Sequence, residues 1–75
     1  MGADDPRKYM QIASAVRAAI AEGELTAGDS VSIARLTAEH AAARRTVAKA
    51  LALVEREGLV KRFPGHGYTV QRAHG

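Results

Sequence analysis

The sequence predicts a single, mainly α-helical domain that ends in a small β-hairpin. Apolar residues recur with helical spacing in three stretches, and two short apolar segments flank the turn sequence 64–67 (PGHG). The apolar content is also rich in alanine, which favours helix over strand. Seventy-five residues make one domain, and we expect an ordered core over about residues 6–71.

The first helix is expected to begin after Asp5, a residue that can cap its N-terminus, with Pro6 in the first turn. Gly23 is expected to end it in a left-handed conformation. The inward-facing residues of this helix are Tyr9, Ile12, Ala13, Val16, Ala19 and Ile20. The segment 25–29 (LTAGD) reads as a turn, and Ser30 and Val31 as a very short strand.

A second helix of about two turns is expected after Ser32, which can cap it. We expect His40 to lie half-buried near its end. The inward-facing residues are Ile33, Leu36 and Thr37.

No breaker residue follows His40, but the apolar stripe changes phase there. A single helix over residues 33–57 also could not fold back to form a core. We therefore predict a tight turn at Ala41 and Ala42, and then a third helix from Ala43 to Glu57. Its inward-facing residues are Val47, Ala50, Leu51 and Val54.

The chain after Gly58 reads as a hairpin, with strands at 59–63 and 68–71 around the 64–67 turn. Three helices followed by a hairpin are typical of the winged helix-turn-helix, in which the hairpin is the wing. In this fold the third helix is a rod that fits the major groove of DNA.

The first half of the third helix carries basic residues without acidic ones. Arg45 and Lys49 share a face, with Arg44 and Thr46 beside them near the helix N-terminus. An ordinary solvated face is the alternative interpretation. However, positive charge at a helix start works against the helix dipole, which favours a functional reason for it. We predict that these four residues contact DNA bases and phosphates.

The hairpin is the second predicted DNA-binding element. Lys61 and Arg62 precede the turn, and Gly65, His66 and Gly67 form a thin tip that can approach a minor groove or a phosphate ridge. A plain β-turn with two solubilising charges is the alternative for the hairpin alone. The basic helix just upstream favours DNA contact.

The chain resembles the N-terminal DNA-binding domain of the GntR-type bacterial regulators over about Tyr9 to Val70. The motifs that carry the resemblance are 9–17 (YMQIASAVR), 20–29 (IAEGELTAGD), 44–51 (RRTVAKAL), 53–60 (LVEREGLV) and 65–70 (GHGYTV). The resemblance implies a regulator that binds an operator as a dimer on an inverted repeat. It matches Arg44 and Thr46 to the family's turn-to-helix motif, and residues 65–67 to its wing tip.

The chain departs from the family pattern at three places. The usual Leu-Pro-Ser with a following acidic and basic residue is replaced by 31–34 (VSIA), which leaves Arg35 as the nearest basic contact. The usual Gly-Val-Ser turn is 41–43 (AAA), which removes a serine cap. Ala48 stands where a second arginine is often found. The family's detailed base contacts therefore cannot be transferred to this chain.

Other classes of function are disfavoured. No Ser or Thr has a plausible His partner for nucleophilic catalysis, and the three histidines lack metal-ligand spacing, so we expect neither an enzyme nor a metal site. The chain has no cysteine and no apolar run long enough for a membrane span. We expect no cofactor and no small-molecule effector, and a location in the bacterial cytoplasm.

The functional prediction is sequence-specific binding of double-stranded DNA and transcriptional regulation, as a repressor that can act as a homodimer. The net charge of +3 suits an anionic partner without establishing one. Two alternatives stay open: a winged helix that docks on another protein, and a nonspecific DNA-binding protein. The scarcity of aromatic residues disfavours stacking on single strands.

Overall fold

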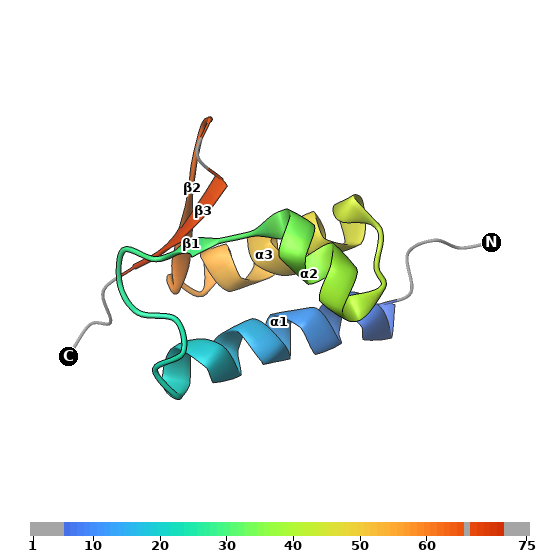
Figure 1. The fold of residues 1–75 in the computed structure, drawn as a ribbon, viewed down its shortest axis with the longest axis horizontal. Helices are drawn as coiled ribbons and strands as arrows, with labels where there is room; N and C mark the ends of the chain where they lie inside the picture. Colours follow the sequence, from blue (N-terminus) through green and yellow to red (C-terminus); the bar gives the residue numbers. More distant parts are fainter. Residues whose placement is uncertain (1–5, 66, 72–75) are drawn as a thin grey trace.

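The computed structural model describes residues 6–65 and 67–71, and it has the predicted order of elements (Figure 1). Asp5 and His66 lie outside the described residues. The elements are α1 (Pro6–Ala21), β1 (Ser30–Val31), α2 (Ile33–His40), α3 (Arg44–Arg56), β2 (Val60–Phe63) and β3 (Gly67–Val70). Three helices and a wing confirm the predicted fold class.

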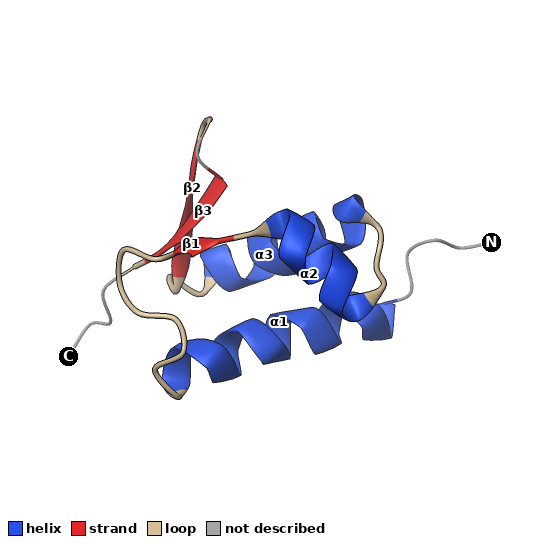
Figure 2. Ribbon diagram, viewed as in Figure 1, coloured by secondary structure: helices blue, strands red, loops and turns tan. Residues whose placement is uncertain are grey.

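The core lies between the three helices and one face of the sheet (Figure 2). Helix α3 contributes most to it, because apolar residues that recur every three to four positions share its inner face. The four residues predicted to face inward, Val47, Ala50, Leu51 and Val54, are fully buried. From α1 the core takes Ile12, Ala13 and Val16, as predicted, while Tyr9, Ala19 and Ile20 are half-buried.

The sheet has three antiparallel strands in the order β1-β3-β2, so β3 is central and β2 is an edge strand. The predicted hairpin pairs Lys61 with Thr69 and Arg62 with Tyr68. The predicted short strand at Ser30 and Val31 is confirmed as β1, which pairs with the outer side of β3. This pairing fixes the base of the wing to the turn that precedes α2.

Helix α2 begins and ends with defined caps. The Ser32 hydroxyl accepts a hydrogen bond from the Arg35 backbone N–H at 3.1 Å, which confirms the predicted N-cap. The helix ends at Ala41, which has left-handed backbone angles (φ 50°, ψ 45°), and this confirms the predicted turn. The Lys8 ammonium donates to the His40 carbonyl at 3.0 Å, so α1 also binds the C-terminal end of α2.

A bidentate ion pair joins α1 to the C-terminal end of α3. The Arg17 guanidinium donates two hydrogen bonds of 2.7 Å to the two carboxylate oxygens of Glu57. These hydrogen bonds hold the pKa of the Glu57 carboxyl below its ordinary value of 4.5. The ion pair therefore adds an exposed polar contact between α1 and the end of α3, which the buried core already packs together. None of the described helices is long and apolar enough to cross a membrane.

Candidate nucleic-acid interface

Helix α3 presents exposed basic side chains away from its buried face, and three of them lie in its first two turns. Arg44, Arg45 and Lys49 are all exposed, whereas the residues that alternate with them in the same turns are buried. We call these three residues the basic face. The structure therefore confirms the predicted division of this helix into an apolar side and a basic side, and the core holds the basic side rigidly outward.

Thr46 does not belong to this surface. It was expected beside the arginines, but it is only 3% exposed and lies with the core side of α3. The physical reason is helical spacing, because Thr46 precedes the buried Ala50 by four residues and so shares its face. The prediction of Thr46 as an exposed DNA contact is wrong for this geometry.

The N-terminus of α3 lacks a side-chain cap. Ala43 has the extended backbone angles of an N-cap residue (φ −68°, ψ 152°) but its methyl group cannot accept a hydrogen bond. Ala43 therefore offers no side-chain acceptor at the start of α3, where Arg44 and Arg45 follow and the Thr46 N–H donates to the Ala43 carbonyl at 3.0 Å. Helix N-termini of this kind attract anions through their first backbone N–H groups and the helix dipole.

Lys49 is held in place by α1. Its ammonium lies 4.8 Å from the centroid of the Tyr9 ring, a cation–π contact that restricts the lysine side chain on the outside of α3. Helix α1 therefore contributes to the interface through Tyr9. The helical spacing of Tyr9 predicts only a core position, because its contact with Lys49 joins two helices far apart in the sequence.

The two basic residues of the wing point to opposite faces of the sheet. Arg62 stands opposite the buried Tyr68, so it lies on the face that packs against the helices, and Lys61 lies on the other face. The Lys61 ammonium lies 5.6 Å from the centroid of the exposed Phe63 ring on that outer face. The structure thus separates two residues that the sequence places side by side.

The wing tip depends on glycines. Gly65 and Gly67 have positive φ angles of 83° and 77°, which side chains rarely tolerate. No other heavy atom crowds either position, so the need for glycine comes from the backbone conformation rather than from packing. His66, predicted to lie at this tip, is outside the described residues.

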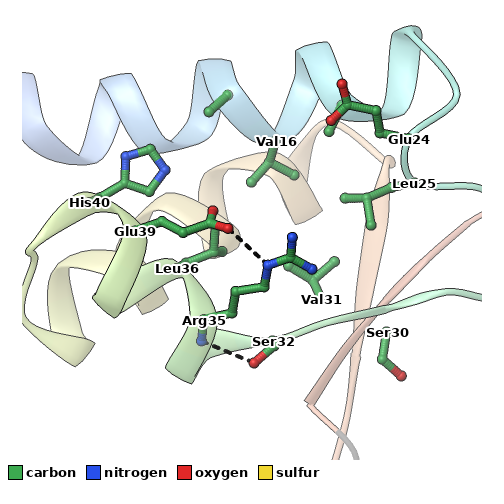
Figure 3. Close-up of a pocket in the computed structure, with 12 residues that line it drawn as sticks. Val16, Glu24, Leu25, Ser30, Val31, Ser32, Arg35, Leu36, Glu39 and His40 are labelled. Carbon is green, nitrogen blue, oxygen red and sulfur yellow. Dashed lines mark hydrogen bonds and ion pairs between the residues drawn. The ribbon is translucent and has the colours of Figure 1, made fainter.

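Arg35 lies away from the basic face. It forms an ion pair with Glu39, with 2.8 Å between the Arg35 Nε and a carboxylate oxygen, and it lines a groove between α1, α2 and β1 (Figure 3). This groove has a volume of about 420 Å³ and includes His40, which is half-buried as expected. The groove takes no lining residue from α3. The structure does not bring Arg35 together with the other predicted contacts.

Acidic residues gather away from the basic face. Glu22, Glu24 and Asp29 are exposed in the connection between α1 and β1, at the far end of α1 from the start of α3. The Asp29 carboxylate also accepts from the Thr26 backbone N–H at 2.8 Å, which closes the turn there. In the part of the chain that the structure describes, no group of acidic or histidine residues could hold a metal ion.

Three helices followed by an antiparallel hairpin define the class of winged helix-turn-helix proteins, and here the third helix carries the exposed basic face. A model of the family described as bacterial regulatory proteins, gntR family, matches residues 8–70. The chain belongs to this family, and the matched part is the family's DNA-binding domain.

Solved structures are similar to the chain over most of its length. YydK of Bacillus subtilis subsp. subtilis str. 168, described as a possible transcriptional regulator, is 30% identical with a TM-score of 0.79 over 91% of this chain. The chain spans only 30% of the YydK chain. The solution structure of the "Streptmycal repressor TraR" is 34% identical with a TM-score of 0.63, and the match covers 88% of this chain and 67% of TraR.

The DNA-binding domain of AraR in complex with its operator ORX1 is 23% identical, with a TM-score of 0.79, over 84% of this chain and 77% of that one. At this identity the likeness concerns the fold. A comparison with curated protein sequences finds no match.

Proposed function

We propose that the chain binds specific sequences of double-stranded DNA through α3 and the wing, and thereby regulates transcription. The observation that supports this best is the basic face of α3, which a fully buried apolar side holds outward beside an uncapped helix N-terminus. A rigid rod with arginine and lysine donors on one side fits the major groove, where base edges can be distinguished.

Each residue has a proposed role. Arg44 and Arg45 reach base edges, where an arginine can donate two hydrogen bonds to guanine. Lys49, restricted by Tyr9, and the first N–H groups of α3 bind phosphates. On the wing, Arg62 and the Gly65–Gly67 tip approach the neighbouring minor groove, while Lys61 binds a phosphate from the other face of the sheet.

Arg35 has a smaller role in this proposal. Its ion pair with Glu39 would have to open before it reached a phosphate. Such an exposed pair is weak, so Arg35 serves as a peripheral contact at most.

We further propose that two copies bind an inverted repeat in the bacterial cytoplasm and repress a promoter by occluding it. One domain of this size offers few contacts, so a single copy binds weakly and with strong salt dependence. The AraR domain was solved on operator DNA and TraR is described as a repressor, which supports this interpretation for a chain of the same fold.

The test is a titration of fluorescein-labelled operator duplex followed by fluorescence anisotropy, with the wild type, Arg44→Ala and Lys49→Ala. We expect Arg44→Ala to weaken binding about tenfold or more, and Lys49→Ala to reduce the slope of log affinity against log salt by about one. Arg35→Ala is the matched control and changes affinity about twofold or less.

Circular dichroism checks that each variant stays folded. Unchanged affinity in both Arg44→Ala and Lys49→Ala would remove α3 from the interface. If the wild type binds no duplex even at low salt, the alternative of a protein-docking winged helix replaces the proposal.

A further inference from the structure

Glu55 makes the direct polar link between α3 and the wing. It lies in the last turn of α3, half-buried, and its carboxylate accepts a hydrogen bond of 3.0 Å from the backbone N–H of Arg62 on β2. No role for this carboxylate follows from the basic face or from the core. The link joins the helix proposed to read the major groove to the hairpin proposed to enter the minor groove.

The position of Arg62 on the edge strand explains why such an acceptor is needed. Every second residue of an antiparallel strand directs its N–H and C=O away from its partner. Strand β2 has β3 on one side only, so the outward N–H of Arg62 has no strand to pair with. The Glu55 carboxylate instead accepts the hydrogen bond that a backbone carbonyl of a neighbouring strand would accept.

The link also acts on the strand that the core supports least. On β2 only Val60 is buried, and the three residues that follow it are exposed. β1 pairs with β3 as far as Tyr68, the partner of Arg62, so only Phe63, Gly67 and the turn form a two-stranded ribbon, which is marginally stable in water by itself. The hydrogen bond at Arg62 lies two residues beyond Val60, at the last level where β1 still flanks β3, so it holds the edge strand to α3 where the outer wing begins.

We propose that Glu55 is a positioning residue, which fixes the wing relative to α3 so that Arg62 and the basic face engage one DNA duplex together. This inference rests on the proposed function. In this role Glu55 strengthens DNA binding by positioning the wing. Its negative charge alone would weaken DNA binding, because a carboxylate close to the interface repels phosphates.

Two substitutions separate the hydrogen bond from the charge. Glu55→Gln keeps an acceptor oxygen and removes the charge, whereas Glu55→Ala removes both. We expect Glu55→Gln to bind an operator duplex at least as tightly as the wild type, and Glu55→Ala to bind about fivefold to tenfold more weakly. Glu22→Ala, which removes an exposed carboxylate from the connection between α1 and β1, is the control and leaves affinity within about twofold. Equal or tighter binding by Glu55→Ala would overturn the proposal.

A double-mutant cycle shows whether Glu55 acts through the wing. Glu55→Ala is expected to add little to Arg62→Ala, because both remove the contribution of the same segment, and to add fully to Arg44→Ala. Full additivity with both partners would mean that Glu55 acts on stability or charge in general, and it would overturn the positioning role.

Amide hydrogen exchange in the DNA-free protein tests the link independently of DNA binding. We expect the Arg62 N–H to be protected in the wild type and in Glu55→Gln, and to exchange about tenfold faster or more in Glu55→Ala. If the wild type binds no DNA while this pattern holds, the proposed function fails and the link stands. If Arg62 exchanges freely in the wild type, the positioning role fails whether or not DNA binds.

Discussion

The N-termini of α2 and α3 lie close in the sequence but are built in opposite ways. Helix α2 begins with Ser32, whose hydroxyl accepts the Arg35 N–H. Helix α3 begins with Ala43, which makes no side-chain cap, and continues with two arginines whose charge opposes the helix dipole. The first terminus has a side-chain cap, whereas the second has none from its N-cap residue and begins with two exposed arginines.

The difference shows where stability and binding are separated in this small domain. A capped terminus contributes about 1 kcal/mol to helix stability, which matters in a domain that buries little surface. The N-terminus of α3 lacks this contribution from a side-chain cap. The helix is stabilised instead by the full burial of Val47, Leu51 and Val54. An anion bound at this end would accept hydrogen bonds from the first backbone N–H groups of the helix.

Substitution of Ala43 is expected to give the largest effect on DNA affinity. Two variants at this position test whether the N-terminus of α3 binds a phosphate. Ala43→Ser and Ala43→Asp should each stabilise the domain by about 1 kcal/mol in urea unfolding, because both can cap α3. Ala43→Ser should leave DNA affinity within about threefold, whereas Ala43→Asp should weaken it about tenfold or more because its charge repels phosphate. Equal affinities for the two variants would mean that no phosphate lies at this terminus.

Removal of the α2 cap is expected to lower the stability of the domain and to leave its DNA affinity nearly unchanged. Ser32→Ala should destabilise the domain by about 1 kcal/mol, with a melting temperature lower by about 4–8 °C. DNA affinity measured well below the melting temperature should change about twofold or less. A large loss of affinity with little loss of stability would show that the start of α2 also contacts DNA.

Substitution of Ala41, in the turn between α2 and α3, is expected to change the stability by a smaller amount. Ala41 has φ 50°, a conformation that costs a residue with a side chain about 1–2 kcal/mol relative to glycine. Ala41→Gly removes this cost but adds about 0.5–1 kcal/mol of backbone entropy to the unfolded state. We expect a net stabilisation of about 0.5 kcal/mol by urea unfolding. A destabilised variant would show that the angle at Ala41 is not strained.

The far end of α3 should give the smallest effect, because its ion pair is exposed. The pKa of Glu57 is lowered in the folded state by hydrogen bonds from Arg17, so the carboxylate stabilises the fold above pH 4.5 and loses this effect as the pH falls through the folded-state pKa. Glu57→Gln should therefore melt below the wild type at pH 7, and the two melting curves should converge in acid. A difference that persisted at pH 2 would indicate a cause other than charge.

Local patterns were sufficient to predict the elements of this fold. The apolar spacing in α1 and α3, the Ser32 cap and the change of phase after His40 each depend on residues within one or two turns. The turn at Ala41 was predicted without a glycine or proline to mark it. The exposed positions of Arg44, Arg45 and Lys49 followed from the same spacing.

Contacts between distant elements could not be predicted in this way. The placement of Lys49 on Tyr9 and the bond from Arg62 to Glu55 depend on how helices and strands pack. Arg35 was expected to support the interface, but its side chain turns to Glu39 along α2. Thr46 is different, because its spacing to Ala50 already indicated a buried side chain.

Selection of bound duplexes from a random DNA pool, followed by sequencing, tests the central claim most directly. The wild type and a variant carrying both Arg44→Ala and Arg45→Ala are compared at the same salt concentration. We expect an enriched motif for the wild type, arranged as an inverted repeat, and its loss in the variant. Retention of duplexes without enrichment, or the same motif from both proteins, would contradict sequence recognition by α3.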